Sequence, residues 1–180
     1  KQVHESAELY IKEGKPLPPE HAFIQPTLDA LNKKTGRKLT EYQMGLKEDL
    51  TPCDFNDPDV WVRGIADLLI VDDDGLKARV VDYKTGNDKY ADTAQLKLMA
   101  LMIFAHFPEV KTVKASLIFL VKNNIIKESY KREDTDRLWS HFTEDLYRLE
   151  QAFKHNVWNA NPTPLCGWCP VRTCEFHKGK

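Results

Sequence analysis

The chain of 180 residues carries 26 Lys and Arg against 27 Asp and Glu, and 42% of its residues are hydrophobic. The near-zero net charge excludes a uniformly basic nucleic-acid binder but allows a local basic groove. A chain of this length can bury a core without disulfides, and its longest apolar runs, 98–107 and 115–121, are too short to span a membrane. The first residues contain no apolar signal segment, so secretion is not expected.

Hydrophobic periodicity in the first half of the chain predicts two helices followed by three strands. Helices are expected over 3–12 and from 26 to about 36, because apolar residues recur there at helical spacing before Gly or Pro. Alternating residues from Lys38 to Leu46 predict a strand with one buried face. Two further strands, 60–71 and 78–84, flank Asp72-Asp73-Asp74-Gly75, which is typical of a hairpin turn.

The second half predicts a helix over 92–106, a buried strand over 115–121, a strand near 125–130 and a long amphipathic helix over 135–155. This order of elements indicates an α/β protein with a mixed sheet. We expect one domain over residues 1–180, in which 159–180 form a Cys-rich appendage after the break at 159–164.

The two hairpin strands carry the most informative polar residues. Asp82 and Lys84 are two residues apart, so their side chains leave the same face of the strand while Tyr83 points to the other. Pairing across the turn can bring Asp67 beside them, and Gly64 would allow backbone or substrate to approach closely. Two carboxylates near an amine favour a divalent cation that activates water against a phosphodiester. The simpler interpretation of Asp82 and Lys84 alone is a solvent-facing ion pair.

These residues occur in an order that resembles the PD-(D/E)xK nuclease superfamily, and within it the RecB-like branch that includes CRISPR-adaptation and phage exonucleases. The resemblance covers residues 3 to about 107. The matching pieces are Val3-His4-Glu5 with Tyr10, Glu41, Gly64-x-x-Asp67, Asp82-Tyr83-Lys84-Thr85-Gly86 and Gln95-Leu96. The resemblance implies a restriction-endonuclease-like core, with a mixed sheet flanked by helices, and a divalent-metal-dependent DNA nuclease.

The resemblance also implies the role of each site residue. The residues that correspond to ligands of one or two Mg²⁺ or Mn²⁺ ions are His4, Asp67, Asp82 and the backbone carbonyl of Tyr83. Lys84 corresponds to the catalytic lysine, and Glu41 is expected near the site. Gln95 corresponds to the first residue of a Gln-x-x-x-Tyr signature that contacts substrate or organises the site. Met99 replaces the aromatic residue of that signature and is expected in the core.

The C-terminal cysteines predict a second metal site, which would be structural. The pattern C-x₂-C-x₄-C-x₂-H consists of Cys166, Cys169, Cys174 and His177, at a spacing that suits a tetrahedral thiolate site in a reducing compartment. Zinc would use these four residues, whereas a [4Fe-4S] cluster would take Cys53 as its fourth ligand. Several RecB-like nucleases carry such a cluster. Zinc, an iron-sulfur cluster and reduced, metal-free cysteines are the alternatives.

Basic residues are concentrated between Lys111 and Arg132, and Lys89 and Lys97 flank the predicted site. These basic residues, which include Lys122, indicate either a surface that follows DNA phosphates or a strand edge protected by lysines. We expect a cytoplasmic deoxyribonuclease of a prokaryotic or phage-infected cell that acts as an exonuclease on single-stranded DNA or free ends, in repair or recombination. The alternative is a non-catalytic DNA- or protein-binding module built around the zinc or iron-sulfur site.

Overall fold

The computed structural model describes residues 2–86 and 88–178. Two compact units are present, Lys1–Ser140 (unit 1) and His141–Lys180 (unit 2). The interpretation of the whole chain as one domain with an appendage from residue 159 stays a prediction, and residues 179–180 of that appendage lie outside the described residues. None of the described helices is both long and apolar enough to cross a bilayer.

The predicted order of helices and strands is found in the structure. The helices are α1 (Gln2–Glu13), α2 (Gln25–Asn32), α3 (Ala94–His106) and α4 (Thr135–His155). The strands are β1 (Arg37–Leu46), β2 (Pro52–Cys53), β3 (Val62–Val71), β4 (Lys77–Lys84), β5 (Thr112–Phe119) and β6 (Asn124–Lys131). Short 3₁₀ segments are formed by Pro19–Ile24, Asp88–Tyr90, Arg132–Asp134 and Pro164–Trp168.

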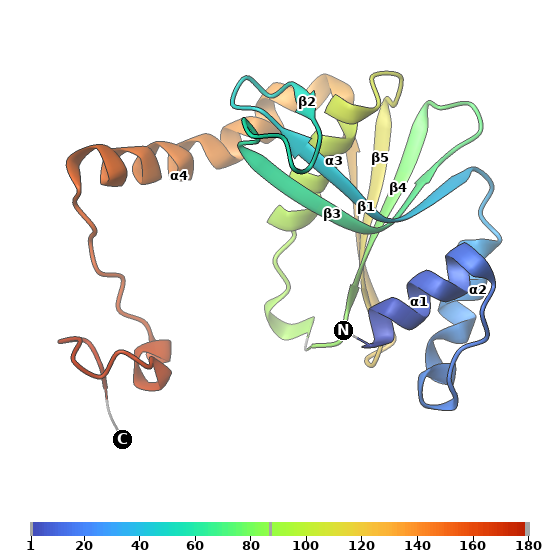
Figure 1. The fold of residues 1–180 in the computed structure, drawn as a ribbon, viewed down its shortest axis with the longest axis horizontal. Coiled ribbons are helices and arrows are strands. Elements are labelled where there is room, and N and C mark those ends of the chain that lie inside the picture. The colour runs from blue at the N-terminus through green and yellow to red at the C-terminus, as the bar shows by residue number, and fades with distance from the viewer. Residues whose placement is uncertain (1, 87, 179–180) are drawn as a thin grey trace. The chain divides into compact units, whose positions relative to one another are not determined.

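Among the described residues, six strands form one sheet in the order β2-β1-β3-β4-β5-β6 (Figure 1). β4 and β5 are parallel and all other neighbours are antiparallel, so the sheet is mixed as predicted. The parallel pair requires a long crossover connection, and this connection contains α3. The two-residue strand β2 was not predicted, because it is too short to show a hydrophobic period.

Alternating residues on β4 show that helices cover both faces of the sheet. Val81 and Tyr83 belong to a buried cluster that they form with residues of α1 and α2. Asp82, which lies between them, contacts Gln95 at the N-terminal end of α3. Because neighbouring strand residues point to opposite faces, α1 and α2 cover one face and α3 covers the other.

β1 departs from regular strand geometry at Glu41, whose φ of 47° lies in the left-handed region. The guanidinium carbon of Arg37 is 5.9 Å from the centre of the Phe107 ring, and the ring of Tyr42 is 5.7 Å from the same centre. Residues five apart face opposite sides of a regular strand, yet both side chains reach the Phe107 ring, with Glu41 between them in the sequence. The register with β3 is the same before and after this point, which places Glu41 opposite Asp67.

Arg132 fixes the C-terminal end of α3. Its Nη2 donates to the carbonyl oxygens of Phe104 at 2.9 Å and Phe107 at 2.7 Å. Its Nε donates to the carbonyl oxygen of Val110 at 2.7 Å. These bonds satisfy carbonyl groups that a helix end leaves without a partner, with a cation at the negative end of the helix dipole. Arg132 therefore has a structural role at the end of α3.

We expect Arg132→Ala to lower the free energy of unfolding by about 2–3 kcal/mol, because a charged donor to several carbonyl groups is lost. Arg132→Lys keeps the charge but not the planar fork, so it should recover only part of this loss. Urea unfolding followed by circular dichroism measures both changes. The exposed neighbour provides the matched control, since Lys131→Ala should change stability by less than about 0.5 kcal/mol. Equal stability of wild type and Arg132→Ala would contradict the structural role.

Candidate active site

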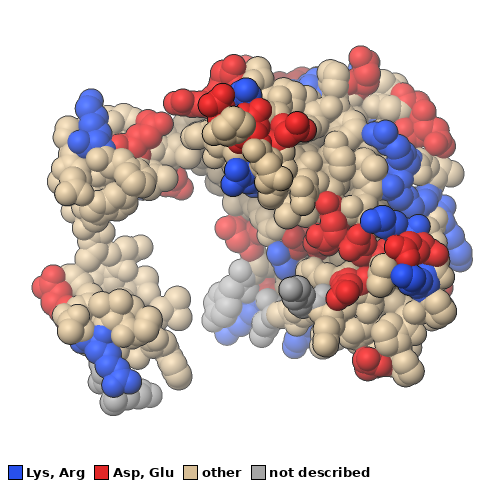
Figure 2. All heavy atoms as spheres, viewed as in Figure 1, with Lys and Arg blue, Asp and Glu red and all other residues tan. Residues whose placement is uncertain are grey.

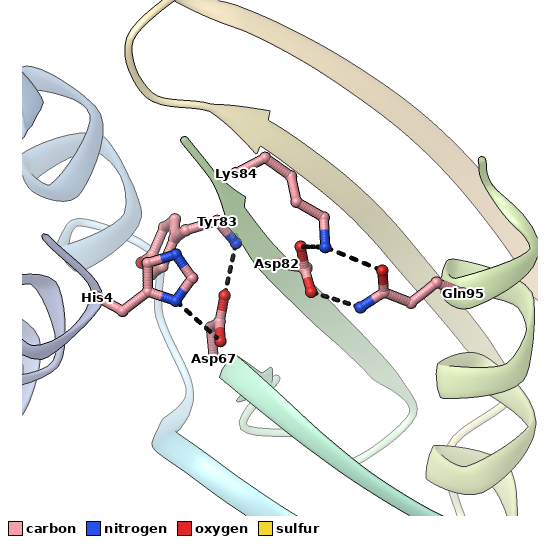
Figure 3. A network of polar contacts seen from close by, with 6 residues as sticks. All are labelled: His4, Asp67, Asp82, Tyr83, Lys84 and Gln95. Atoms are coloured by element: carbon pink, nitrogen blue, oxygen red, sulfur yellow. Dashed lines mark hydrogen bonds and ion pairs between the residues drawn. The ribbon is translucent and has the colours of Figure 1, made fainter. Parts of the chain in front are cut away.

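The hairpin of β3 and β4 opens at the end opposite its turn. Cross-strand pairing extends to Leu68 and Val81, so the next residues in that register are Asp67 and Asp82. At this point the backbone N–H of Tyr83 donates to Oδ2 of Asp67 at 2.6 Å. A side-chain carboxylate thus takes the place of the next backbone partner, and both aspartates lie where the strands separate (Figure 3).

Asp82, Lys84 and Gln95 form a closed network of polar contacts (Figure 3). Nζ of Lys84 lies 2.7 Å from Oδ2 of Asp82 and donates to Oε1 of Gln95 at 3.0 Å. Nε2 of Gln95 donates to Oδ1 of Asp82 at 2.6 Å. Asp82 and Lys84 therefore lie on one face, as strand alternation predicted. Both ends of the Gln95 amide are engaged, so this residue positions Asp82 and Lys84.

His4 and Tyr83 lie on the other side of Asp67. Nδ1 of His4 is 3.7 Å from Oδ1 of Asp67, and the His4 ring meets the Tyr83 ring edge to face at 6.1 Å. The Tyr83 residue is only 3% exposed and its side chain packs beneath α1 and α2, so it is the backbone of Tyr83 that borders the site. The structure therefore brings α1 to the site through His4.

Burial raises the pKa of the Asp67 carboxyl, and the nearby charge of Asp82 raises it further. The hydrogen bond from the N–H of Tyr83 and the electrostatic interactions with His4 and Lys84 act in the opposite direction. Two carboxylates that repel each other in a partly buried position are stabilised when a cation lies between them. The electrostatics of the opening therefore favour cation binding.

Glu41 lies beside the site, as the resemblance implied. Burial raises the pKa of its carboxyl, and the charges of Asp67 and Glu8 raise it further, whereas His4 lowers it. Figure 2 shows acidic side chains gathered near the N-terminal end of α1. The acidic group at the site thus extends beyond the two predicted aspartates to Glu41 and Glu8. Sequence reasoning missed Glu8, because a single acid on an amphipathic helix gives no signal of its own.

The donor atoms at the opening fit a hard divalent cation. Within residues 2–86 and 88–178, no three His, Cys, Asp or Glu side chains are arranged around one point as metal ligands. Mg²⁺, however, needs only one or two carboxylates and completes its coordination with water. Oδ2 of Asp82 is buried and has no hydrogen-bond partner among the described residues, and its contact with Lys84 is an ion pair. The full ligand set of His4, Asp67, Asp82 and the Tyr83 carbonyl stays a prediction.

Gly64 allows a neighbouring element to approach β3 closely. A Cβ atom at Gly64 would lie 2.7 Å from Sδ of Met102 on α3. The missing side chain therefore lets α3 pack closely on β3, and the approach of substrate at this position stays a prediction. Met99 of the same helix is buried, as predicted.

The predicted DNA-contacting lysines are distributed over separate elements. Lys89 lies in the 3₁₀ segment Asp88–Tyr90, Lys97 lies on α3, and Lys122 lies in the turn between β5 and β6. Lys89 and Lys122 are exposed, whereas Lys97 is half-buried. Their contact with DNA stays a prediction.

The C-terminal cysteines belong to unit 2, and all four cysteines of the chain are free thiols. The N–H of Thr163 donates to Sγ of Cys166 at 3.4 Å. Nδ1 of His177 lies 3.0 Å from the carbonyl oxygen of Cys166, and this hydrogen bond leaves Nε2 as the ring nitrogen with a free lone pair. Cys53 lies on β2 in unit 1, where burial raises the pKa of its thiol and disfavours the thiolate.

Fold and site together define a restriction-endonuclease-like core, in which a mixed sheet flanked by helices presents two aspartates and a lysine where a hairpin opens. The sequence model of the PD-(D/E)XK nuclease superfamily matches residues 3–174, and the chain belongs to this superfamily. Its members are metal-dependent nucleases that generally use Mg²⁺ or Mn²⁺. No curated protein sequence matches the chain.

Replacing Asp67 by Asn tests the effect of burial on the site. Because the pKa of Asp67 is raised in the folded state, the ionised carboxylate destabilises the protein at neutral pH, and this destabilisation disappears when the carboxyl is protonated in acid. Asn still offers an oxygen to the Tyr83 N–H. In EDTA, Asp67→Asn should raise the free energy of unfolding by about 1 kcal/mol at pH 7 and give no gain near about pH 3.

Urea unfolding at the two pH values measures this difference. The control is Asp73→Asn in the exposed turn, which should leave the free energy of unfolding unchanged at both pH values. Added Mg²⁺ should stabilise wild type more than Asp67→Asn. An equal gain at both pH values would contradict the assignment of the effect to ionised Asp67.

Proposed function

We propose that this chain is a deoxyribonuclease of the RecB-like branch that hydrolyses phosphodiester bonds from the ends of single-stranded or unwound DNA. The observation that carries the proposal is the closed network of Asp82, Lys84 and Gln95 beside Asp67 at the opening of the hairpin. This arrangement combines cation-binding oxygens with a positive side chain held at fixed distance. The preference for DNA ends is supported by the resemblance of the ordered motifs to RecB-like exonucleases.

Each residue of the site has a separate task in the proposed reaction. Asp67 and Asp82 hold the cation, together with the Tyr83 carbonyl and His4. When bound, the cation supplies the Lewis acidity that lowers the pKa of a water and stabilises charge on the phosphodiester. Lys84 orients the attacking water and stabilises the negative charge that develops on the phosphate oxygens. Gln95 keeps Asp82 and Lys84 in place before substrate binds.

An assay on end-labelled single-stranded DNA with Mg²⁺ or Mn²⁺ tests the proposal. Asp82→Asn and Lys84→Met should each lower kcat by about 10²–10³-fold or more, because each removes a group that acts on the reacting atoms. Gln95→Leu should lower kcat by about 10–100-fold with little change in KM, since it removes a positioning residue. EDTA should abolish cleavage.

The control on the same strand is Lys77→Met, at the far end of β4, which should retain wild-type kcat. Undiminished cleavage by Asp82→Asn or Lys84→Met would overturn the assignment of the site. Cleavage of circular single-stranded DNA would show an endonuclease and overturn the proposed action from ends.

We further propose that Cys166, Cys169, Cys174 and His177 hold a structural zinc ion. The hydrogen bond from Nδ1 of His177 to a backbone carbonyl is the second-sphere contact that zinc-binding histidines commonly make. It leaves Nε2 for the metal, and the N–H of Thr163 stabilises charge on the sulfur of Cys166. The His177 contact supports the zinc alternative, because a cluster completed by Cys53 would not use this side chain.

Elemental analysis of anaerobically purified protein should find about one zinc per chain, the content of a closed tetrahedral site. Cys53→Ser should retain the metal and His177→Ala should lose it. Iron with inorganic sulfide, visible absorption of a cluster, and loss of the metal in Cys53→Ser would instead support the [4Fe-4S] alternative and contradict the zinc site.

A further inference from the structure

A groove of about 790 Å³ lies in unit 1 on the face of the sheet that carries α1 and α2. α2 forms one wall, β4 and β5 form the floor, and β6 forms the far wall. The groove exists because α2 has only eight residues and covers only part of this face. In the described part of unit 1, the portion of this face over β5 and β6 is not covered by α1 or α2.

The floor of the groove is aliphatic. Val81 and Ile118 lie next to the buried cluster beneath α1 and α2, and register places Ile118 directly opposite Ile125 on β6. Ile125 is 42% exposed, so this part of the apolar lining is open to a partner. Among the described residues that line the groove none is aromatic, although grooves for single-stranded nucleic acids usually offer aromatic rings for base stacking. This floor suits aliphatic side chains.

Basic side chains also line the groove. The basic side chains that line it are Lys34, Arg79, Lys114 and Lys127. Glu128 is the only acidic residue in the described lining. Arg79 is paired with Asp72, whereas the three lysines form no ion pair with another described residue. The uncompensated positive charge favours an acidic occupant.

The groove and the candidate active site lie on opposite faces of the sheet. Val81 faces the groove, whereas its neighbour Asp82 and the next residue of the same face, Lys84, contact Gln95 on α3. A DNA strand bound by Asp82 and Lys84 therefore does not occupy the groove. The groove is therefore available to a partner other than the substrate.

We propose that this groove binds an acidic amphipathic helix of a partner protein. A helix about 10 Å wide can lie beside α2 and extend the helical layer over β5 and β6. Its aliphatic residues, repeating every three or four positions, cover Ile118 and Ile125, and its acidic residues pair with Lys114 and Lys127. An extended peptide would instead add to the outer edge of β6, where lysine side chains disfavour strand pairing.

The probe that tests this proposal is a fluorescein-labelled helical peptide of about five turns, with Leu at helical spacing on one face and Glu beside it. Fluorescence anisotropy should give a dissociation constant of about 10 µM. Lys114→Glu combined with Lys127→Glu should weaken binding by about tenfold or more, and so should Ile125→Asp. Lys33→Glu combined with Lys111→Glu makes the same charge change outside the groove and should alter affinity by less than about twofold.

Further probes separate this proposal from general charge attraction. A peptide with the same composition in scrambled order should bind about tenfold more weakly, because its leucines no longer share a face. Equal binding of both peptides, or no effect of Ile125→Asp, would overturn the proposal. So would labelled oligothymidine that competes with the peptide and loses affinity in the same variants, since the groove would then bind nucleic acid. If Ile125→Asp does not fold, as judged by circular dichroism, Ile125→Ser takes its place.

Discussion

The hydrogen bond from the backbone N–H of Tyr83 to the carboxylate of Asp67 is the contact on which the site depends. A backbone N–H that loses its strand partner in a partly buried position needs another acceptor, and Asp67 supplies one. The strands can therefore separate without leaving an unsatisfied donor. Because the ring of Tyr83 is buried beneath α1 and α2, the same residue anchors β4 in the core and fixes the direction of its backbone. The separation of β3 and β4 at the site is thus fixed by core packing.

Helices from both faces of the sheet converge on this opening, and core contacts fix each of them. α1 is tied to its neighbours by the hydrogen bond from Tyr10 to Asp29 and by the contact of Ser6 with His21 at 2.8 Å. These contacts determine where His4 lies. On the other face, Arg132 holds the C-terminal end of α3, whose N-terminal end carries Gln95. The geometry of the site therefore depends on contacts far from it.

Local sequence pattern was sufficient for the helices, for the five longer strands and for the central pair of the site. The shared face of Asp82 and Lys84 follows from strand alternation alone, which is a property of two neighbouring residues. Contacts between distant residues leave no such pattern. The left-handed backbone of Glu41 and the double hydrogen bond of Gln95 were not predictable, because each depends on tertiary neighbours. β5 begins three residues earlier than expected, at Thr112, since the exposed Lys114 interrupts the apolar run.

The amide of Gln95 is chemically suited to holding an anion and a cation at once. A carboxylate at this position would attract Lys84 but repel Asp82, and an amine would do the reverse. A neutral amide offers a donor to one and an acceptor to the other. Because an amide does not titrate, this clamp keeps the same hydrogen-bonding pattern at every pH at which Asp82 and Lys84 are charged. The distance between Asp82 and Lys84 therefore does not depend on the protonation of the histidine and carboxylates around them.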